Sequence, residues 1–258
     1  MTIPDKIFII PYRDRASQKT NFLNHMKYIL EDIPQTEYEI YFAHQCDGRP
    51  FNRGSMKNIG FLAIKNKYPD HYKDITFIFN DVDTMPRYKN LIDYNTSLGT
   101  VRHFYGFNFA LGGLFSIKGA DFENINGFPG YWGWGLEDNE IYQRALSANL
   151  TVDRGNFFKI GSQEIIHLHD SPLRLANNSD PTRYKQRHTD GINCIKLLDY
   201  TIENDSITTR HFINSINPSN DKFYYKNIET DTRLYENYLD RQHKKRDNKK
   251  WNMTNFYK

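Results

Sequence analysis

The stretch ITFIFNDVD, residues 75–83, is the strongest strand signal in the chain, and it ends in polar residues. Its β-branched and aromatic side chains are typical of a buried strand. Two similar runs precede it, KIFII at 6–10 and YEIYFAHQ at 38–45. Between these runs, apolar residues recur at helical spacing over 16–31 and 54–68. The alternation of strands and helices predicts an α/β fold with a mostly parallel sheet.

The polar stretches that follow these strands are expected to converge. Residues 11–15, 44–53 and 80–83 all lie just beyond a predicted strand. In open α/β sheets, ligands bind outside the carboxyl ends of the strands. The sequence therefore predicts one crevice that these three segments line.

Beyond residue 84 the pattern is less regular, but four segments still carry signals. Residues 108–125 predict a strand and then a helix, 137–149 predict a helix, and 163–170 predict a strand that ends in two histidines. Residues 171–190 are polar and contain proline, which predicts a long loop of the length often used as a functional lid.

Length and polarity suggest a domain plan. At 258 residues the chain is long enough for one sizeable domain with an appendage. Polar residues dominate from about residue 205, so we expect a main domain over 1–204 and a polar, partly helical C-terminal extension over 205–258. The extension contains the basic run HKKRDNKK, residues 243–250, which fits contact with an anionic surface but fits a solvated tail better.

Charge and hydropathy argue against several classes of protein. The 34 basic residues nearly balance the 31 acidic ones, so we expect no nucleic-acid partner, which usually needs a concentrated basic face. No apolar run reaches the roughly 20 residues of a membrane span, and the first residues lack the pattern of a signal peptide. The two cysteines lie far apart, give no disulfide framework and favour a reducing compartment.

The motif NDVD places two carboxylates, Asp81 and Asp83, at the end of an apolar strand. In an extended chain, residues two apart point the same way. Carboxylates in this position can hold a hard cation that neutralises a diphosphate. A strand-end cap or turn accounts for the pair equally well.

The motif HLHD places His167 and His169 two apart, after a predicted strand. Imidazoles at this spacing can chelate one transition metal such as Mn or Zn. For this motif alone, two surface histidines are the better account. A D-x-D motif in the same chain reverses that preference, because one carboxylate and two imidazoles leave coordination positions open for substrate oxygens.

Three arginines follow the predicted strands, namely Arg13, Arg15 and Arg53. Guanidinium groups can clamp phosphate oxygens through paired N–H donors, although a solvated positive face is the commoner role of arginine. Phe51 lies two residues before Arg53 and fits either stacking on a base or packing in the core.

The stretch YWGWGLEDNE, residues 131–140, alternates aromatic residues with glycine before a group of acidic residues. Gly133 and Gly135 free the backbone on either side of Trp134, so that this side chain can swing. Two carboxylates follow at a predicted helix start, where the helix dipole favours acidic residues in any case. Helix capping explains the carboxylates but not the alternation of aromatic residues and glycine.

Six motifs in this order, PYRDR, FNRGSMKNIGF, NDVD, GG, INGFPGYWGWGLED and HLHD, resemble those of the β1,4-galactosyltransferase family. The resemblance covers roughly residues 6–200, and the W-G-W-G-x-E-D pattern is highly specific to that family. It implies the GT-A glycosyltransferase fold, with a Rossmann-like, mostly parallel sheet flanked by helices, and an inverting, metal-dependent sugar transfer. The HxH motif resembles the xylosylprotein β1,4-galactosyltransferase branch more than the lactose-synthesising branch.

The resemblance also implies roles for single residues. Asp138 would be the general base that takes the proton from the acceptor hydroxyl, and Trp134 would close over the donor. The loop 171–190 would be a lid that orders when the donor binds. Manganese would be held against the diphosphate of a UDP-sugar by three side chains: Asp83, His167 and His169.

The resemblance also implies which residues contact each of the two substrates. The donor would contact nine residues: Pro11, Arg13, Arg15, Phe51, Arg53, Asp81, Val82, Gly113 and Trp134. The acceptor, or sugar hydroxyls, would contact three: Tyr131, Trp132 and Glu137. The implied partners are a UDP-sugar donor and a glycan or glycosylated-protein acceptor.

The chain departs from the family pattern at several points. The family usually has Glu-Asp-Asp where this chain has Glu137-Asp138-Asn139, so one charge is lost and the base is retained. Ala110 stands where the family usually has a tyrosine near the donor sugar, which should enlarge the pocket and admit GalNAc or GlcNAc as well as galactose. We find no counterpart of the usual membrane anchor and stem, so we expect a cytoplasmic enzyme of a microbe or a large virus.

The predicted function is therefore Mn-dependent transfer of a hexose from UDP to a hydroxyl, with inversion, by a GT-A catalytic domain over 1–204. A non-catalytic sugar-binding module and a UDP-sugar hydrolase on the same fold stay open as alternatives. Retention of Asp138 and of all three candidate metal ligands argues against the binding module. Nothing in the sequence separates transfer to an acceptor from transfer to water.

Overall fold

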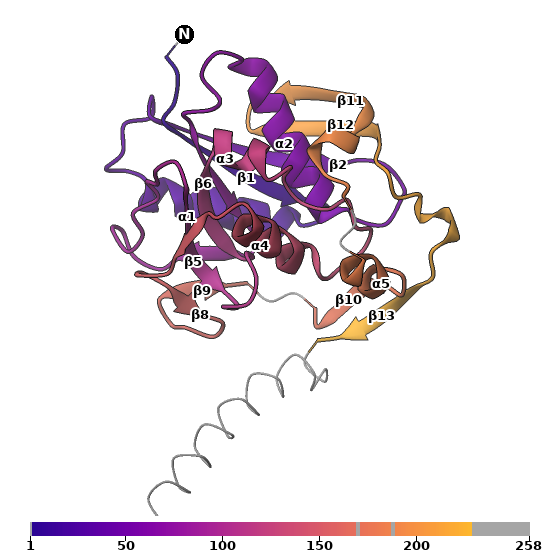
Figure 1. The fold of residues 1–258 in the computed structure, drawn as a ribbon. Helices are drawn as coiled ribbons and strands as arrows, with labels where there is room; N and C mark the ends of the chain where they lie inside the picture. Colours follow the sequence, from indigo (N-terminus) through magenta and orange to yellow (C-terminus); the bar gives the residue numbers. More distant parts are fainter. Residues whose placement is uncertain (1, 169–170, 187–188, 229–258) are drawn as a thin grey trace, which may run out of the picture.

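The structure is a computed structural model that describes residues 2–168, 171–186 and 189–228. Its centre is a nine-stranded sheet with helices on both faces (Figure 1). The strand order is β11-β12-β2-β1-β3-β6-β5-β7, and β8 pairs with β5. Two smaller sheets are formed by β4 with β9 and by β10 with β13.

The elements follow the chain in a simple order. The first half contains β1 (Lys6–Tyr12), α1 (Ala16–Ile29), β2 (Tyr38–Gln45), α2 (Arg53–Lys67), β3 (Thr76–Asn80), β4 (Thr84–Pro86), β5 (Thr100–Gly106), β6 (Leu114–Lys118) and α3 (Gly119–Asn124). The second half contains α4 (Glu137–Ser147), β7 (Thr151–Asp153), β8 (Phe158–Lys159), β9 (Ile165–His167), β10 (Leu173–Asn177), α5 (Asp180–Lys185), β11 (Lys196–Glu203), β12 (Ser206–Ile213) and β13 (Phe223–Asn227). Two short 3-10 helices lie at Ile192–Cys194 and Pro218–Asn220.

The middle of the sheet is parallel. β1 pairs in parallel with β2 and β3, and β12 pairs in parallel with β2. β6 runs antiparallel to both β3 and β5, and β11 runs antiparallel to β12. The predicted α/β fold with a mostly parallel sheet is confirmed.

The side chains of β1 belong to two hydrophobic clusters, because successive side chains of a strand point to opposite faces. Ile7 and Ile9 belong to the cluster that also holds buried residues of α2 and α4. Phe8 and Ile10 belong to the cluster that holds the buried residues of α1. The helices predicted over 16–31 and 54–68 are thus α1 and α2, packed on opposite faces of the sheet.

Local chemistry sets the ends of the elements nearest the site. β1 pairs with β3 only as far as Ile9, so Pro11, which lacks an N–H, falls where β1 has a single neighbour. The Asn52 side chain accepts a hydrogen bond from the Ser55 N–H at 2.8 Å and caps α2. Arg53 therefore lies in the first turn of α2.

The predicted long loop over 171–190 is wrong in its secondary structure. It contains the strand β10 and the short helix α5. β10 forms by pairing antiparallel with β13, with Leu175 opposite Tyr225. Because that partner lies some fifty residues further along the chain, the strand has no local signal in its own window.

The sheet also continues past the expected domain boundary at residue 204. β12 joins the central sheet, with Ser206 opposite Phe42, and lies at its edge with β11 (Figure 1). Polar residues dominate this strand, but Ile207 and Phe212 are fully buried in the core. The part of the expected C-terminal extension beyond residue 228 lies outside the described residues.

Candidate active site

Charged side chains from three elements meet at the strand ends of the central sheet. Asp81 follows β3, Arg53 opens α2, and Asp138 lies in the first turn of α4. We call Arg53, Lys57, Asp81, Glu137 and Asp138 the charged cluster. Segments more than 80 residues apart in the sequence thus supply one site, as expected for strand ends of a parallel sheet.

Arg53 joins the carboxylates of this cluster. Its Nη2 lies 2.7 and 2.8 Å from the two carboxylate oxygens of Asp81. Its Nη1 lies 2.6 Å from Oε1 of Glu137 and 2.8 Å from Oδ2 of Asp138. Burial alone would lower the pKa of Arg53, but the carboxylates outweigh it and raise that pKa. The guanidinium group therefore stays charged.

The turn before α4 directs the side chains of Glu137 and Asp138 towards Arg53. Leu136 adopts a left-handed φ of 69°, and Gly135 has a φ of 120°, so the chain bends sharply before the helix begins. The Gly135 N–H donates to Oε2 of Glu137 at 3.1 Å. Glu137 is only 3% exposed, and burial together with the neighbouring Asp138 raises its pKa. The two adjacent carboxylates thus have different environments, which suits different roles.

The glycine pair of the GG motif makes room for these carboxylates. A β-carbon at Gly112 would lie 2.4 Å from Oδ2 of Asp138. Gly113 has a φ of 70°, and its carbonyl accepts the Asp81 N–H at 3.0 Å. The Leu111 N–H donates to the Asp138 carbonyl at 2.8 Å. The segment before β6 therefore positions the backbone of Asp81 and that of Asp138 together.

Asp83 and His167, which we call the metal pair, face each other beside the cluster. The antiparallel pairing of β4 with β9 sets Thr84 opposite His167, and the Leu168 N–H donates to the Asp83 carbonyl at 2.8 Å. Oδ2 of Asp83 lies 3.8 Å from Nε2 of His167, and this carboxylate raises the pKa of His167 against the effect of burial. A carboxylate and an imidazole at this separation fit a manganese ion as ligands.

The third candidate ligand, His169, lies outside the described residues. Within the described ranges, no three His, Cys, Asp or Glu side chains gather as a metal-holding group. Arg15 lies close to the metal pair, with Nη1 3.9 Å from Oδ2 of Asp83. Tyr105 contacts it from the other side, since its hydroxyl lies 3.3 Å from Nδ1 of His167.

The other expected donor residues line the same region without joining the charged cluster. Arg13 donates to the Arg49 carbonyl and so connects the end of β1 with the segment after β2. The Phe51 carbonyl accepts the Gly133 N–H at 2.9 Å, and its ring packs against the core. Pro11 and Val82 are both buried, so a ligand can reach little more than their backbone.

The aromatic residues of the YWGWG segment separate into two groups. Tyr131 and Trp132 are 1% and 0% exposed, and Trp132 stacks on Phe212. The structure therefore does not bring Tyr131 and Trp132 to a surface that a sugar could contact, because both side chains belong to the core. Trp134 is half-buried. Its backbone N–H donates to the Leu175 carbonyl at 2.7 Å, and the Lys226 ammonium group lies over its ring.

The segment expected to be a lid is held by a network of ion pairs. Arg183 of α5 lies 2.8 and 2.9 Å from the two carboxylate oxygens of Asp221, and 2.9 Å from Asp180. The Asn177 side chain donates to Asp221 at 2.7 Å. Burial raises the pKa of Asp180 to about 7. β10 and α5 are therefore fastened to the segment before β13.

Sequence reasoning missed three polar residues of the site. Lys57 is buried beside Asp138, and its spacing of four from Arg53 on a predicted helix is the signal that could have found it. His103 of β5 lies beneath the GG segment with Nε2 3.0 Å from the Gly112 carbonyl, and Arg154 donates to its Nδ1. Burial and the nearby Arg154 lower the pKa of His103 to about 4, which keeps it neutral. These last two had no local signal.

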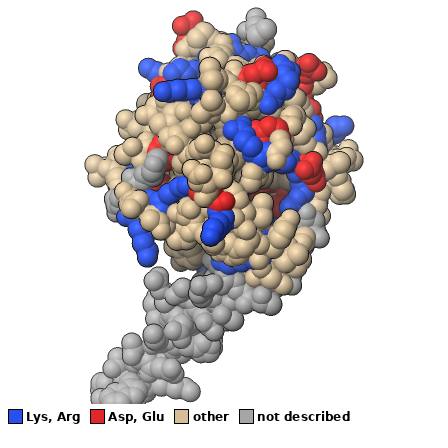
Figure 2. All heavy atoms as spheres, turned by 90° about the vertical axis from the view of Figure 1, so that its right-hand side faces the viewer, with Lys and Arg blue, Asp and Glu red and all other residues tan. Residues whose placement is uncertain are grey.

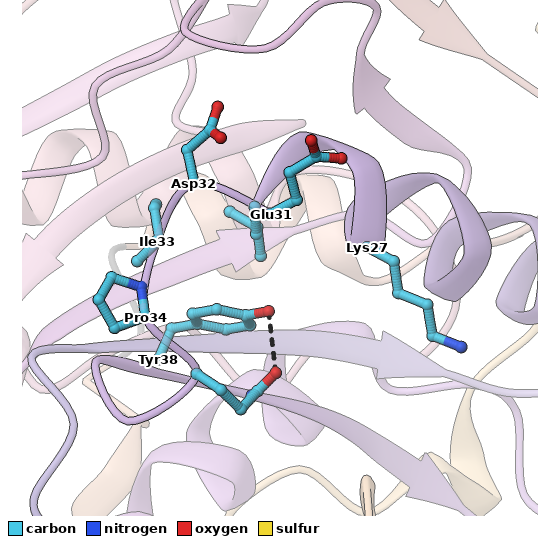
Figure 3. Close-up of a pocket in the computed structure, with 8 residues that line it drawn as sticks. Lys27, Glu31, Asp32, Ile33, Pro34 and Tyr38 are labelled. Atoms are coloured by element: carbon cyan, nitrogen blue, oxygen red, sulfur yellow. Dashed lines mark hydrogen bonds between the residues drawn. The ribbon is translucent and has the colours of Figure 1, made fainter.

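Other surface features lie apart from this site. A surface pocket between α1 and β2 is lined by Lys27, Glu31, Asp32 and Tyr38 among others (Figure 3). The Tyr38 hydroxyl donates a hydrogen bond to the Gln35 side chain, which also lines it. It shares no residue with the charged cluster or the metal pair. Basic and acidic residues alternate over the face in Figure 2 without a patch of one sign. Among the described residues, no helix has the length and apolar character needed to cross a membrane.

Comparison with known families matches two consecutive parts of the chain. Residues 4–95 match the family described as the N-terminal region of glycosyl transferase group 7. Residues 97–170 match the family described as the N-terminal domain of galactosyltransferase. Together these segments contain Arg53, both aspartates of NDVD and Asp138.

Relatives extend the similarity over most of the chain. β1,4-Galactosyltransferase 7 of Drosophila melanogaster is 30% identical over 204 residues, which are 73% of this chain and 61% of that protein. Xylosylprotein 4-β-galactosyltransferase of Caenorhabditis elegans is 27% identical and shares 74% of this chain and 70% of its own length. The chain spans less than two thirds of the Drosophila relative.

The fold matches solved structures of the same kind. The catalytic domain of Drosophila β1,4-galactosyltransferase 7 in complex with xylobiose aligns with a TM-score of 0.66 at 23% identity, over 84% of this chain and 96% of that one. A mutant of the same protein in complex with manganese, UDP-Gal and xylobiose aligns with a TM-score of 0.65. The GT-A fold class predicted from the motifs is confirmed.

The comparison overturns one expectation. We expected a cytoplasmic protein of a microbe or a large virus. The relatives are galactosyltransferases of animals, which belong to the secretory pathway, so the expected cytoplasmic location is wrong. That expectation depended on the absence of a hydrophobic anchor signal, and such an absence is weak evidence beside homology.

The motifs, the strand-end site and the two matched segments agree on one assignment. The chain belongs to the β1,4-galactosyltransferase family.

Proposed function

We propose that this protein is an inverting, Mn-dependent glycosyltransferase that moves a hexose from a UDP-sugar to a sugar hydroxyl. The observation that carries the proposal is the position of Asp138. Its carboxylate lies at the start of α4, 2.8 Å from Arg53 and in contact with the Gly112 backbone. Asp83 and His167 lie 3.8 Å apart, and Asp81, two residues before Asp83, shares the Arg53 guanidinium with Asp138.

In this proposal Asp138 is the general base. The acceptor hydroxyl oxygen attacks C1 of the donor sugar from the side opposite UDP, and the C1–O bond to the β-phosphate breaks. The electron pair of that bond stays on the phosphate oxygen, while the hydroxyl proton passes to a carboxylate oxygen of Asp138. A positioned base contributes about 10²–10⁴-fold to such a step.

Asp83 and His167 are the described residues that would hold manganese, with His169 as the third proposed ligand. Bound manganese offsets the negative charge that develops on the departing diphosphate. Arg15, whose Nη1 lies 3.9 Å from Asp83, is proposed to bind the same phosphates. Arg53 is proposed to bind the donor through the N–H groups that now contact Asp81.

The proposed donor is UDP-galactose, because that is the donor in the complex of the Drosophila relative. Ala110 widens the proposal to UDP-GalNAc and UDP-GlcNAc. Ala110 is small and 4% exposed, and the backbone N–H of the adjacent Leu111 donates to the Asp138 carbonyl. A small residue here is proposed to leave room near the donor sugar, at a position where the family usually has a tyrosine.

The proposed acceptor is a glycan or a glycosylated protein that presents a β-xyloside. The name of the nematode relative and the xylobiose bound to the Drosophila relative support this choice. Trp134 and Glu137 are the described residues proposed to contact the acceptor or its sugar hydroxyls. Tyr131 and Trp132 are proposed to support them from the core. The catalytic unit is proposed to run to residue 227, since β12 and β13 pair with strands of the first 204 residues.

A UDP-sugar hydrolase remains the second candidate, since water can occupy the acceptor position. The test is release of UDP from UDP-Gal, UDP-GalNAc and UDP-GlcNAc, with Mn²⁺ or with EDTA, in the presence and absence of a β-xyloside. The transferase predicts Mn-dependent release that the xyloside stimulates, with a glycosylated product. Release that is independent of any acceptor would favour the hydrolase, and UDP binding without release would favour a binding module.

A further inference from the structure

The most unusual residue of the site is a buried lysine. Lys57 lies one helical turn after Arg53 on α2, and its side chain is 1% exposed. Lysine is almost never fully buried unless it is paired, because taking an ammonium group out of water is costly. A lysine in this position therefore needs an explanation.

The contacts of Lys57 point to the carboxylates of the charged cluster. Its Nζ lies 3.4 Å from Oδ1 of Asp138 and 4.0 Å from Oδ1 of Asp81. On its other side it lies 4.4 Å from the centre of the Phe128 ring. Burial and the charge of Arg53 lower the pKa of Lys57. Since replacing a buried ion pair by apolar residues is often neutral or stabilising, stability alone does not explain this lysine.

The two oxygens of Asp138 have different partners. Arg53 lies 2.8 Å from Oδ2, and Lys57 lies 3.4 Å from Oδ1. The Arg53 side chain is 15% exposed and is shared among Asp81, Glu137 and Asp138, whereas Lys57 is enclosed. If Arg53 turns towards the donor, as in the proposed function, its Nη1 leaves Oδ2 of Asp138 together with its contacts to Asp81, while Lys57 stays at Oδ1.

We propose that Lys57 is a positioning residue that holds Oδ1 of Asp138 and leaves Oδ2 to accept the proton of the acceptor. This inference rests on the proposed function of Asp138 as the general base. Lys57 also keeps a cation beside the carboxylate when Arg53 turns towards the donor.

The pH dependence of the reaction reports this role. The charged and titratable groups that face Asp138 are Arg53 and Lys57 from α2, Glu137 from α4, Asp81 from the end of β3 and His103 from β5. An ionised carboxylate is stabilised by a nearby cation. Removal of Lys57 therefore shifts the acid limb of kcat/KM to higher pH.

The test compares wild type with Lys57→Met and Lys57→Arg, and uses Lys65→Met as the matched control. Lys65 lies on the same helix but pairs with Glu123 at the surface, with 36% of its side chain exposed. Methionine has a similar length to lysine and fits an apolar site, so Lys57→Met tests the charge with little change of packing. Each protein is assayed for kcat, KM for the donor, the pH profile and the thermal midpoint.

The inference predicts that Lys57→Met lowers kcat about 10-fold to 100-fold, which is at or below the lower end of the roughly 10²–10⁴-fold contribution of a general base, since the base itself is still present. It also predicts an unchanged donor KM and a shifted acid limb, with a thermal midpoint near that of wild type because Asp138 keeps Arg53 as a cation partner. Lys57→Arg recovers part of kcat, and Lys65→Met behaves as wild type. An unchanged kcat and pH profile in Lys57→Met, or a fall in kcat that follows a lower thermal midpoint without a shift of the acid limb, would overturn it. Absence of transfer in every protein, wild type included, contradicts the proposed function and the role of Lys57 with it.

Discussion

Gly112 lies against Asp138 so closely that a β-carbon at position 112 would be 2.4 Å from the carboxylate oxygen Oδ2. The neighbouring atoms Cγ and Cβ of Asp138 would lie 2.8 and 3.3 Å from it. No side chain other than hydrogen fits at Gly112 unless the carboxylate moves. This contact makes the position of the proposed base depend on a residue that performs no chemistry.

Gly112→Ala should therefore displace the carboxylate of Asp138. A shift of about 1 Å in a reacting group costs about 10²-fold in rate, so kcat should fall by about that factor while UDP and Mn²⁺ still bind. The measurement is kcat together with the Kd for UDP in the presence of Mn²⁺. Gly155→Ala is the control, because Gly155 is exposed and a β-carbon there meets only the end of the Asp153 side chain at 3.2 Å. Equal activity of the two variants would contradict the proposed importance of this contact.

Much of the fold was predictable because its signals are local. The runs KIFII and YEIYFAHQ are continuous and apolar, and they form β1 and β2 as predicted. The helix expected over 137–149 is α4, which begins at the acidic residues that the dipole favours. β10 was not predictable, since it becomes a strand only by pairing with β13, and the position of β12 in the central sheet was not predictable, since it depends on pairing with β2.

The same distinction applies to the site. Arg53, Asp81 and Asp138 were predicted because each belongs to a motif at an element end. Their mutual distances were not, and neither was the burial of Trp132, which depends on Phe212 of β12. The family resemblance implied that Trp132 contacts the acceptor or sugar hydroxyls, but packing against a distant strand places its side chain in the core.

Arg53→Met should destabilise the folded protein. The change leaves Glu137, which is 3% exposed, and Asp138 without their shared cation. Removal of one partner of a buried ion pair typically costs about 3–5 kcal/mol. Because burial already raises the pKa of Glu137, the cost should shrink as the pH falls and this carboxylate takes up a proton. The measurement is the free energy of unfolding by urea at pH 7 and pH 5, and a loss below about 1 kcal/mol at pH 7 would show that Arg53 is not needed to hold the carboxylates.

Asp180 should make stability fall as the pH rises, because burial outweighs its ion pair with Arg183. Burial raises the pKa of Asp180 from 3.8 to about 7, so between these values the folded protein binds a proton that the unfolded chain has lost. Stability from this group is therefore complete below about pH 4 and is lost as the pH rises towards 7. As the pH rises from about 4 to 7, the thermal midpoint of wild type should therefore fall relative to that of Asp180→Asn.

Asp221 provides the matched comparison for this pH effect. Burial opposes its charge, but hydrogen bonds from Arg183 and Asn177 prevail and lower the pKa of Asp221. Its contribution should be present at neutral pH and be lost only as the pH falls below the usual range of an aspartate. Parallel thermal midpoints of wild type and Asp180→Asn from pH 4 to pH 8 would show that Asp180 is not a buried acid of this kind.

Ala110 should influence the choice of donor. If its small side chain leaves space for an N-acetyl group, wild type should transfer from UDP-GalNAc or UDP-GlcNAc as well as from UDP-Gal. Ala110→Tyr should lower kcat/KM for the N-acetylated donors by about 10-fold or more relative to UDP-Gal, since the loss of a well-filled pocket contact is worth about 1–3 kcal/mol. Ala110→Ser, which adds one oxygen, serves as the control. Turnover of UDP-Gal alone by wild type would contradict the wider donor range.

The central claim is that Asp138 takes the proton of the acceptor, and one comparison tests it most directly. Asp138→Asn keeps the size of the side chain but removes the base, and Asn139→Ala alters the next residue of the same helical turn as a control. The measurement is kcat for transfer, together with the Kd for UDP and Mn²⁺. The account predicts that Asp138→Asn loses about 10²–10⁴-fold in kcat with nearly unchanged UDP binding, while Asn139→Ala stays close to wild type. A kcat for Asp138→Asn within a few-fold of wild type would contradict the assignment of Asp138 as the base.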